Sequence, residues 1–168
     1  HIKVLFFHFS SAGGQVPDQV DSTRGSSLQQ VNDILLGKKG VTPLSEWVSE
    51  WQPNKLMAPV VERYADQYSL YYLSDTNPWH IEFLLARDPL LPHFQSGTTS
   101  FEAKVLKPDR TIYEFAARKH DFLPKEAIFI DDRAANVAGA EAVGYVGLHY
   151  KPDQHKIFDT FFCSKIRM

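Results

Sequence analysis

Four polar side chains in this sequence stand where short apolar runs end or where a helix begins, and together they could handle a phosphoryl group. They are Ser74, Lys107, Asp131 and Asp132. An acidic pair supplies the hard oxygen ligands that Mg²⁺ prefers, and a lysine and a hydroxyl group can bind phosphate oxygens. Asn136, four residues after Asp132, could support such a metal site. The types of these residues therefore indicate phosphoryl chemistry with a divalent cation.

Alternating strands and helices must position these residues. Short apolar runs bounded by turn-forming residues predict strands over 2–9, 69–73, 127–130 and 145–149. Helical spacing of apolar residues is found over 56–64, 81–85, 112–116, 134–142 and 157–162. This alternation is typical of an α/β three-layer sandwich, with a mostly parallel sheet between two layers of helices. Ligands bind such sheets beyond the carboxyl ends of the strands, which is where the polar residues fall.

The overall composition excludes several kinds of function. The 18 Lys and Arg residues against 20 Asp and Glu residues leave a formal charge of −2, whereas nucleic-acid binding needs a concentrated basic face. The lone cysteine, Cys163, cannot form an intramolecular disulfide, which favours a reducing compartment. No stretch approaches the roughly 18 apolar residues of a membrane span. We therefore expect a cytoplasmic protein that binds neither nucleic acid nor membranes, and a protein partner stays open.

Three segments resemble the motifs of the haloacid dehalogenase-like (HAD) superfamily of hydrolases. They read LSDTN at 73–77, LKPDRTIYE at 106–114 and AIFIDDRAANVAGAEAVG at 127–144. The branch that they resemble most contains small sugar-phosphate phosphatases and epoxide-hydrolase-type phosphatase domains. The resemblance implies a Rossmann-like sheet, Mg²⁺ as cofactor, and a small phosphorylated molecule or inorganic phosphate as ligand.

The resemblance also implies a role for each matching residue. The phosphate-binding positions of the family correspond to Ser74, Asp75 and Lys107, of which Ser74 and Lys107 also serve catalysis. The metal-ligand positions correspond to Asp131 and Asp132, with Asn136 in support. The polar, glycine-containing stretch 13–54 falls where the family carries a helical cap. We therefore expect a reduced helical cap over 13–54 and an α/β core made of 1–12 and 55–168.

The first motif of the family is where this chain departs from it. His8 stands where the hydrolases carry the aspartate that attacks phosphorus, and Ser10 stands where many carry a second aspartate as general acid. The change removes a nucleophile and an anionic ligand, and an imidazole is a poor ligand for Mg²⁺. We predict a phosphatase that is weakly active or inactive, with weakened Mg²⁺ binding. A histidine nucleophile, metal-activated water, and a non-catalytic module that binds phosphate, a metabolite or a protein remain the alternatives.

Overall fold

The computed structural model describes residues 4–7, 55–76 and 78–166. In this part of the chain, five parallel strands form one sheet in the order β3-β2-β1-β4-β5. The strands are β1 (Val4–Phe7), β2 (Ser69–Ser74), β3 (Ser96–Thr99), β4 (Ala127–Asp131) and β5 (Val146–His149).

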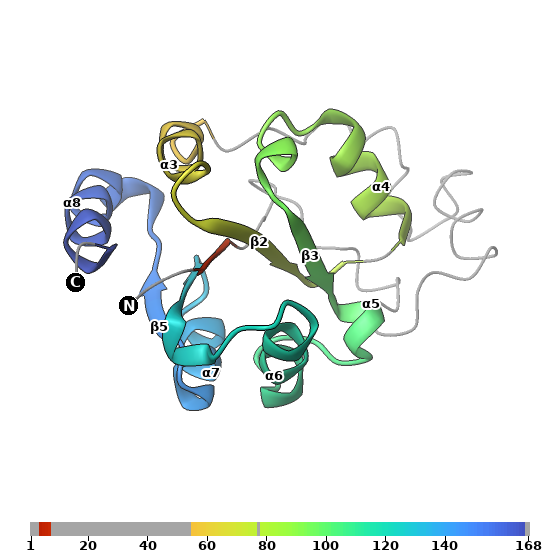
Figure 1. Ribbon diagram of the computed structural model, residues 1–168. Helices are drawn as coiled ribbons and strands as arrows, with labels where there is room; N and C mark the ends of the chain where they lie inside the picture. The colour runs from red at the N-terminus through yellow and green to blue at the C-terminus, as the bar shows by residue number, and fades with distance from the viewer. Residues whose placement is uncertain (1–3, 8–54, 77, 167–168) are drawn as a thin grey trace, which may run out of the picture.

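Helices cover both faces of this sheet (Figure 1). They are α3 (Ala58–Tyr64), α4 (Pro78–Arg87), α5 (Ser100–Ala103), α6 (Arg110–Lys119), α7 (Ala134–Val143) and α8 (His155–Ile166), with short 3₁₀ turns η1 (Leu91–His93), η2 (Pro124–Glu126) and η3 (Pro152–Gln154). Helices α3, α4 and α8 lie on one face, and α5, α6 and α7 lie on the other (Figure 1). The predicted three-layer α/β sandwich is confirmed.

Strand β4 shows how the sequence builds the two halves of the core. All five of its residues are buried, and successive side chains point to opposite faces of the sheet. Ile128 and Ile130 join the apolar cluster formed with α3, α4 and α8, whereas Ala127 and Phe129 join the cluster formed with α6 and α7. Burying a side chain such as Ile128 or Phe129 contributes about 1.5–3 kcal/mol.

A capping residue fixes one end of each of the two helices, α6 and α7, that border the polar residues of interest. The Asp109 carboxylate accepts a hydrogen bond from the Thr111 backbone N–H at 2.7 Å and so begins α6. Gly144 ends α7 with a φ of 107°, a conformation that glycine adopts without the steric cost that a Cβ brings.

Strand β3 is absent from the sequence-based prediction because its sequence, SGTT, is polar. Its residues Gly97, Thr98 and Thr99 are nevertheless buried. A Cβ atom at Gly97 would lie 2.0 Å from the ring of Tyr72, so the absence of a side chain lets that ring cover the strand. The other predicted strands are confirmed to within a residue or two of their ends where the structure describes them.

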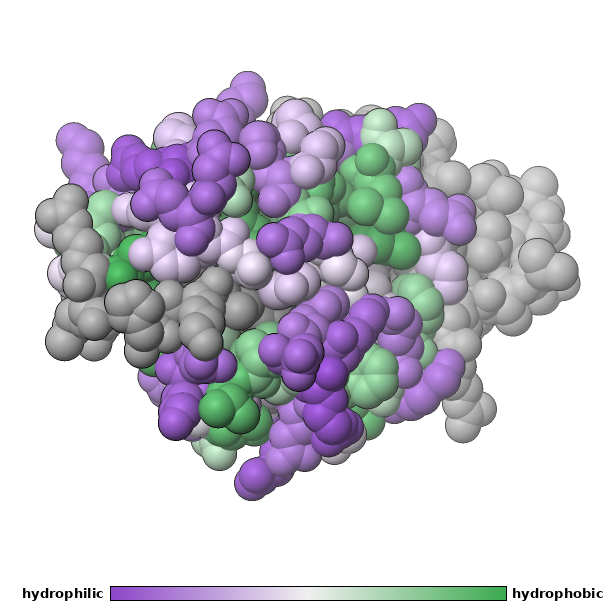
Figure 2. All heavy atoms as spheres, viewed as in Figure 1, coloured by the Kyte–Doolittle hydropathy of each residue, from purple (hydrophilic) through white to green (hydrophobic). Residues whose placement is uncertain are grey.

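The described surface is polar over most of the face seen in Figure 2, with hydrophobic side chains in small, scattered groups. None of the described helices is long and apolar enough to cross a membrane. The expected cap, 13–54, lies outside the described residues and stays a prediction.

Candidate functional site

Lys107 is a buried lysine whose ammonium group lies at the carboxyl edge of the sheet. Its Nζ donates a hydrogen bond to the Leu73 carbonyl at 3.0 Å and another to Asp131 Oδ2 at 3.1 Å. The side chains of Lys107 and Asp131 are both 0% exposed. Leu73 belongs to β2 and Asp131 to β4, the two strands that flank β1. The ammonium group therefore lies just beyond the end of β1, whose last residue, Phe7, pairs with the residues that precede Leu73 and Asp131.

A buried ion pair of this kind is an expensive feature of a fold. Removing two charges from water costs several kcal/mol for each ion, and the attraction between them often does no more than offset that cost. Stability alone therefore gives little reason for Lys107 and Asp131 to be there. Buried charges at the carboxyl edge of a parallel sheet are instead typical of functional sites.

Asp131 is held by hydrogen bonds on both of its carboxylate oxygens. Besides Lys107, it accepts from the Arg133 backbone N–H at 2.8 Å and from Asn136 Nδ2, which is 3.1 Å from each oxygen. These contacts match the roughly four acceptor positions of a carboxylate. Asp131 is therefore better suited to orient its neighbours than to contact a ligand directly.

The residue that supports this arrangement, Asn136, is fixed from α6. Its backbone carbonyl accepts a hydrogen bond from the Tyr113 hydroxyl at 2.8 Å, and the Tyr113 carbonyl accepts from the Tyr145 hydroxyl at 2.8 Å. All three residues are buried. Burial also raises the pKa of the Tyr113 and Tyr145 hydroxyls above the usual value, so both remain hydrogen-bond donors at neutral pH.

Asp132 differs from its neighbour because it lies beyond the end of β4 and is exposed. Its backbone carbonyl accepts a hydrogen bond from His149 Nε2 at 3.0 Å. Two consecutive aspartates thus occupy opposite environments, the first buried and the second on the surface at the same edge.

Ser74 ends β2 and Asp75 follows it, beside the ion pair. Ser74 is 3% exposed, and Asp75 Oδ1 accepts a hydrogen bond from the backbone N–H of Lys107 at 3.0 Å. Burial raises the pKa of the Asp75 carboxyl, and the nearby Lys107 only partly offsets that rise.

The structure therefore brings six of the predicted site residues to one edge of the sheet, namely Ser74, Asp75, Lys107, Asp131, Asp132 and Asn136. The other two, His8 and Ser10, lie outside the described residues. Tyr113 and His149, which contact the backbones of Asn136 and Asp132, are absent from the residues predicted for this site. His149 carried a readable signal, since it ends a predicted strand at this edge.

The carboxylate oxygens at this edge of the sheet are the type of ligand that a divalent cation binds. Carboxylate oxygens such as those of Asp132 are the ligands that Mg²⁺ prefers. Within the described ranges, however, no group of three or more His, Cys, Asp or Glu side chains could hold a metal ion. Asp132 could therefore supply one ligand to Mg²⁺, but the described residues do not supply a complete set of ligands.

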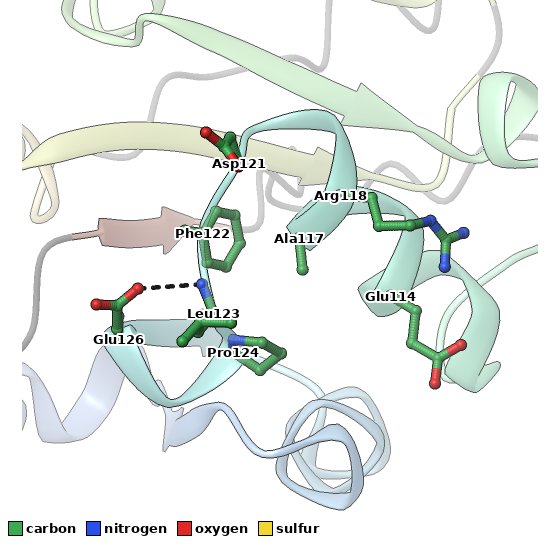
Figure 3. A pocket seen from close by; sticks show the side chains of 8 residues that line it. All are labelled: Glu114, Ala117, Arg118, Asp121, Phe122, Leu123, Pro124 and Glu126. Atoms are coloured by element: carbon green, nitrogen blue, oxygen red, sulfur yellow. Dashed lines mark hydrogen bonds between the residues drawn. The ribbon is translucent and has the colours of Figure 1, made fainter.

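A separate cavity of about 450 Å³ lies at the opposite edge of the sheet (Figure 3). It is lined by residues at the end of α6 and around η2, among them Arg118, Asp121 and Leu123. Glu126, which also lines it, accepts a hydrogen bond from the Leu123 backbone N–H at 3.1 Å. None of the predicted site residues lines this cavity, so it is distinct from the candidate site.

Comparison with known proteins adds a family and several relatives. A family model described as haloacid dehalogenase-like hydrolase matches residues 29–144. A sesquiterpene phosphatase of Aspergillus oryzae is 49% identical over 43 residues, which make up 26% of this chain and 22% of the relative. A D-ribitol-5-phosphate phosphatase of Bacteroides thetaiotaomicron is 27% identical over 84 residues, 46% of this chain and 41% of the relative. The chain thus aligns with less than half the length of either protein.

Solved structures share the fold at low identity. A variant of a HAD family enzyme from Bacteroides thetaiotaomicron, in complex with magnesium and inorganic phosphate, superposes with a TM-score of 0.73 at 18% identity, over 90% of this chain and 95% of that one. A 2-haloacid dehalogenase from Pseudomonas syringae gives a TM-score of 0.61 at 14% identity, over 91% and 88%. At these identities the superpositions establish the fold alone.

Proposed function

The chain belongs to the haloacid dehalogenase-like hydrolase family, and from this premise we propose that it is a phosphatase-type member that binds a small phosphate monoester at the carboxyl edge of its sheet. The observation that carries the proposal is the buried pair of Lys107 and Asp131, which bridges the strands on either side of β1. In this proposal Lys107 and the Ser74 hydroxyl bind phosphate oxygens. Asp75 lines the same site.

Each residue of the site has a distinct task in this proposal. The Leu73 carbonyl and Asp131 fix the position of the Lys107 ammonium, so an incoming anion meets a charge that is already oriented. Asn136 fixes Asp131 in turn. Preorganised groups of this kind interact with a ligand without the cost of reordering side chains.

Asp132 is the residue that would hold a divalent cation in this site. A bound Mg²⁺ would neutralise part of the phosphate charge. With a histidine at position 8 and Asp131 already hydrogen-bonded, we propose that Mg²⁺ binds weakly, because a hard cation requires several oxygen ligands. Phosphate binding is then independent of added Mg²⁺.

His8 directly follows Phe7, the last residue of β1. Because the Lys107 ammonium lies beyond the end of this strand, the residue at position 8 is the natural candidate for the attacking group. An imidazole in place of a carboxylate removes the means of forming an aspartyl-phosphate intermediate. We propose that turnover is weak or absent. A domain that binds phosphate or a partner without catalysis is the alternative that the same observation favours.

We propose a broader substrate class than the substrate that either relative's name gives. One relative is a phosphatase of a sesquiterpene and the other of ribitol 5-phosphate, so one name points to an apolar alcohol and the other to a polyol. A sugar phosphate and a sesquiterpene phosphate are therefore the two substrates to compare. We place this chemistry in the cytoplasm, where small phosphorylated metabolites are available.

Hydrolysis of p-nitrophenyl phosphate, measured with and without Mg²⁺, tests the proposal on wild-type protein and on His8→Asp. We expect negligible turnover by wild type and Mg²⁺-dependent turnover by His8→Asp, because the variant regains the nucleophile and an anionic ligand. His93→Asp is the matched control, since it makes the same substitution at an exposed histidine of η1. Wild-type turnover of about 1–10³ s⁻¹ would contradict the assignment of a weakened site.

A calorimetric titration with inorganic phosphate separates the remaining outcomes. Phosphate binding by wild type without turnover supports a non-catalytic binding domain. If neither wild type nor His8→Asp binds phosphate at millimolar concentration, the proposed site is wrong.

A further inference from the structure

A histidine side chain from the neighbouring strand holds the backbone of Asp132. In the parallel ladder, Asp131 pairs with His149, and the Tyr150 backbone N–H donates to the Asp131 carbonyl at 2.9 Å. One residue further along, the Asp132 carbonyl is 3.0 Å from His149 Nε2. Since a carbonyl oxygen only accepts hydrogen bonds, Nε2 carries the proton. The imidazole thus adds one side-chain hydrogen bond between β5 and the residue that follows β4, beyond the last backbone hydrogen bond of the sheet.

Tyr150, which follows His149 at the end of β5, packs against α8. Tyr150 is 5% exposed, its ring packs edge-on against Phe158 with centroids 5.0 Å apart, and its hydroxyl lies 3.3 Å from His155 Nδ1. Phe158 and His155 belong to α8. The residue next to His149 is therefore anchored to a helix, which limits movement of the imidazole.

The loop on the other side of Asp132 is equally constrained. The Arg133 backbone N–H donates to Asp131 Oδ1 at 2.8 Å, and the Arg133 carbonyl accepts from the Asn136 backbone N–H at 3.0 Å as α7 begins. Asp132 thus lies between two fixed residues. A fixed carbonyl at Asp132 itself restricts the rotation of its peptide units and so restricts the directions in which its carboxylate can point.

We propose that His149 is a positioning residue for the Asp132 carboxylate. The inference rests on the proposed function, in which Asp132 provides an oxygen ligand to a divalent cation. His149 acts on the backbone of Asp132 and has no need to touch the cation. It is exposed, so replacing it removes a hydrogen bond without opening a cavity in the core.

Variants at position 149 test this positioning role, with Mn²⁺ as the probe. His149→Ala removes the donor, and His149→Gln keeps an N–H donor on a side chain of similar reach. Lys151→Ala is the control, because Lys151 is exposed and lines the same small pocket as His149. Mn²⁺ affinity is measured by water-proton relaxation, and hydrogen exchange of the amides of residues 132–136 is followed in parallel.

We expect His149→Ala to weaken Mn²⁺ binding about 3–10-fold, the effect of losing one hydrogen bond, and to speed exchange in the loop. His149→Gln and Lys151→Ala are expected to stay within about twofold of wild type.

Each other result has a definite meaning. If wild type binds Mn²⁺ and His149→Ala binds it equally well, the positioning role is refuted and the proposed function stands, even where exchange is faster. Phosphate binding without any Mn²⁺ binding by wild type also overturns the positioning role. Failure of wild type to bind either Mn²⁺ or inorganic phosphate overturns the proposed function as well.

Discussion

Removal of the Lys107 ammonium is the sharpest perturbation of the buried ion pair. Lys107→Met keeps the length and the apolar stem of the side chain but leaves Asp131 charged in an environment where its side chain is 0% exposed. Coulomb attraction across the 3.1 Å between Nζ and Oδ2 is about 5 kcal/mol at an effective dielectric constant of about 20. Breaking a buried pair by removing one partner costs about 3–5 kcal/mol.

We therefore expect Lys107→Met to lower the free energy of unfolding by about 3–5 kcal/mol. The total for a domain is about 5–15 kcal/mol, so the variant stays folded unless the wild type lies at the lower end of that range. Urea denaturation at neutral pH, followed by circular dichroism, measures the loss. The double variant Lys107→Met/Asp131→Asn removes both charges, and we expect it to recover part of the stability because no unpaired charge remains buried.

The matched control is Lys119→Met, since Lys119 Nζ pairs with Glu102 Oε1 at 2.8 Å in a partly exposed setting and also donates to the Gly97 carbonyl at 2.6 Å. An exposed pair contributes only about 0–1 kcal/mol, and the hydrogen bond to Gly97 adds about 1 kcal/mol. A Lys107→Met loss no larger than that of Lys119→Met would refute the reasoning, because it would mean that the charge of Asp131 is not desolvated in the folded protein.

Three further changes test other parts of the structure. Tyr113→Phe leaves the buried Asn136 carbonyl without the hydroxyl that donates to it at 2.8 Å, so we expect urea denaturation to show a loss of about 1–3 kcal/mol. Gly139→Ala brings a Cβ to 2.7 Å from the Pro108 carbonyl oxygen. The overpacking cost of about 1–3 kcal/mol then competes with a helix-propensity gain of about 1 kcal/mol, and a stabilised variant would contradict the close packing of α6 on α7. Burial, with a smaller effect of Lys119, lowers the pKa of His120 from 6.5 to about 4. The unfolded chain therefore takes up this proton first, and stability falls as the pH decreases through that interval. His120→Gln is expected to show a weaker decline over the same range.

The fold is largely predictable because its central strands contain continuous apolar runs. The stretch 127–130 has no polar residue, and a run of this kind fits only a strand that is covered on both faces. Strand β3 could not be predicted in this way, because it has no apolar run. The burial of Thr98 and Thr99 depends instead on partners elsewhere in the chain. One such partner is His120, whose Nε2 lies 3.0 Å from the Thr98 hydroxyl oxygen. Contacts between residues 22 apart in sequence leave no local pattern.

The candidate site is predictable in its residue types and not in its pairings. Ser74, Lys107 and Asp131 are recognisable from the ends of strands and from the family motifs. That Lys107 spans from Leu73 to Asp131, over separations of 34 and 24 residues, follows only from the order of the strands. Because β1 lies between β2 and β4, a side chain must bridge the end of β1 to reach both.

The different environments of Asp131 and Asp132 follow from the two-residue period of a strand. Ala127 and Phe129 face the layer of α6 and α7, so Asp131, two residues after Phe129, faces the same layer. Lys107 approaches from that side, with its Nζ 5.8 Å from the centre of the Phe129 ring. Asp131 is thereby enclosed with its partners, whereas Asp132 lies past the last rung of the backbone ladder and remains exposed. A single step in sequence therefore separates a buried carboxylate, which is paired with Lys107, from an exposed one.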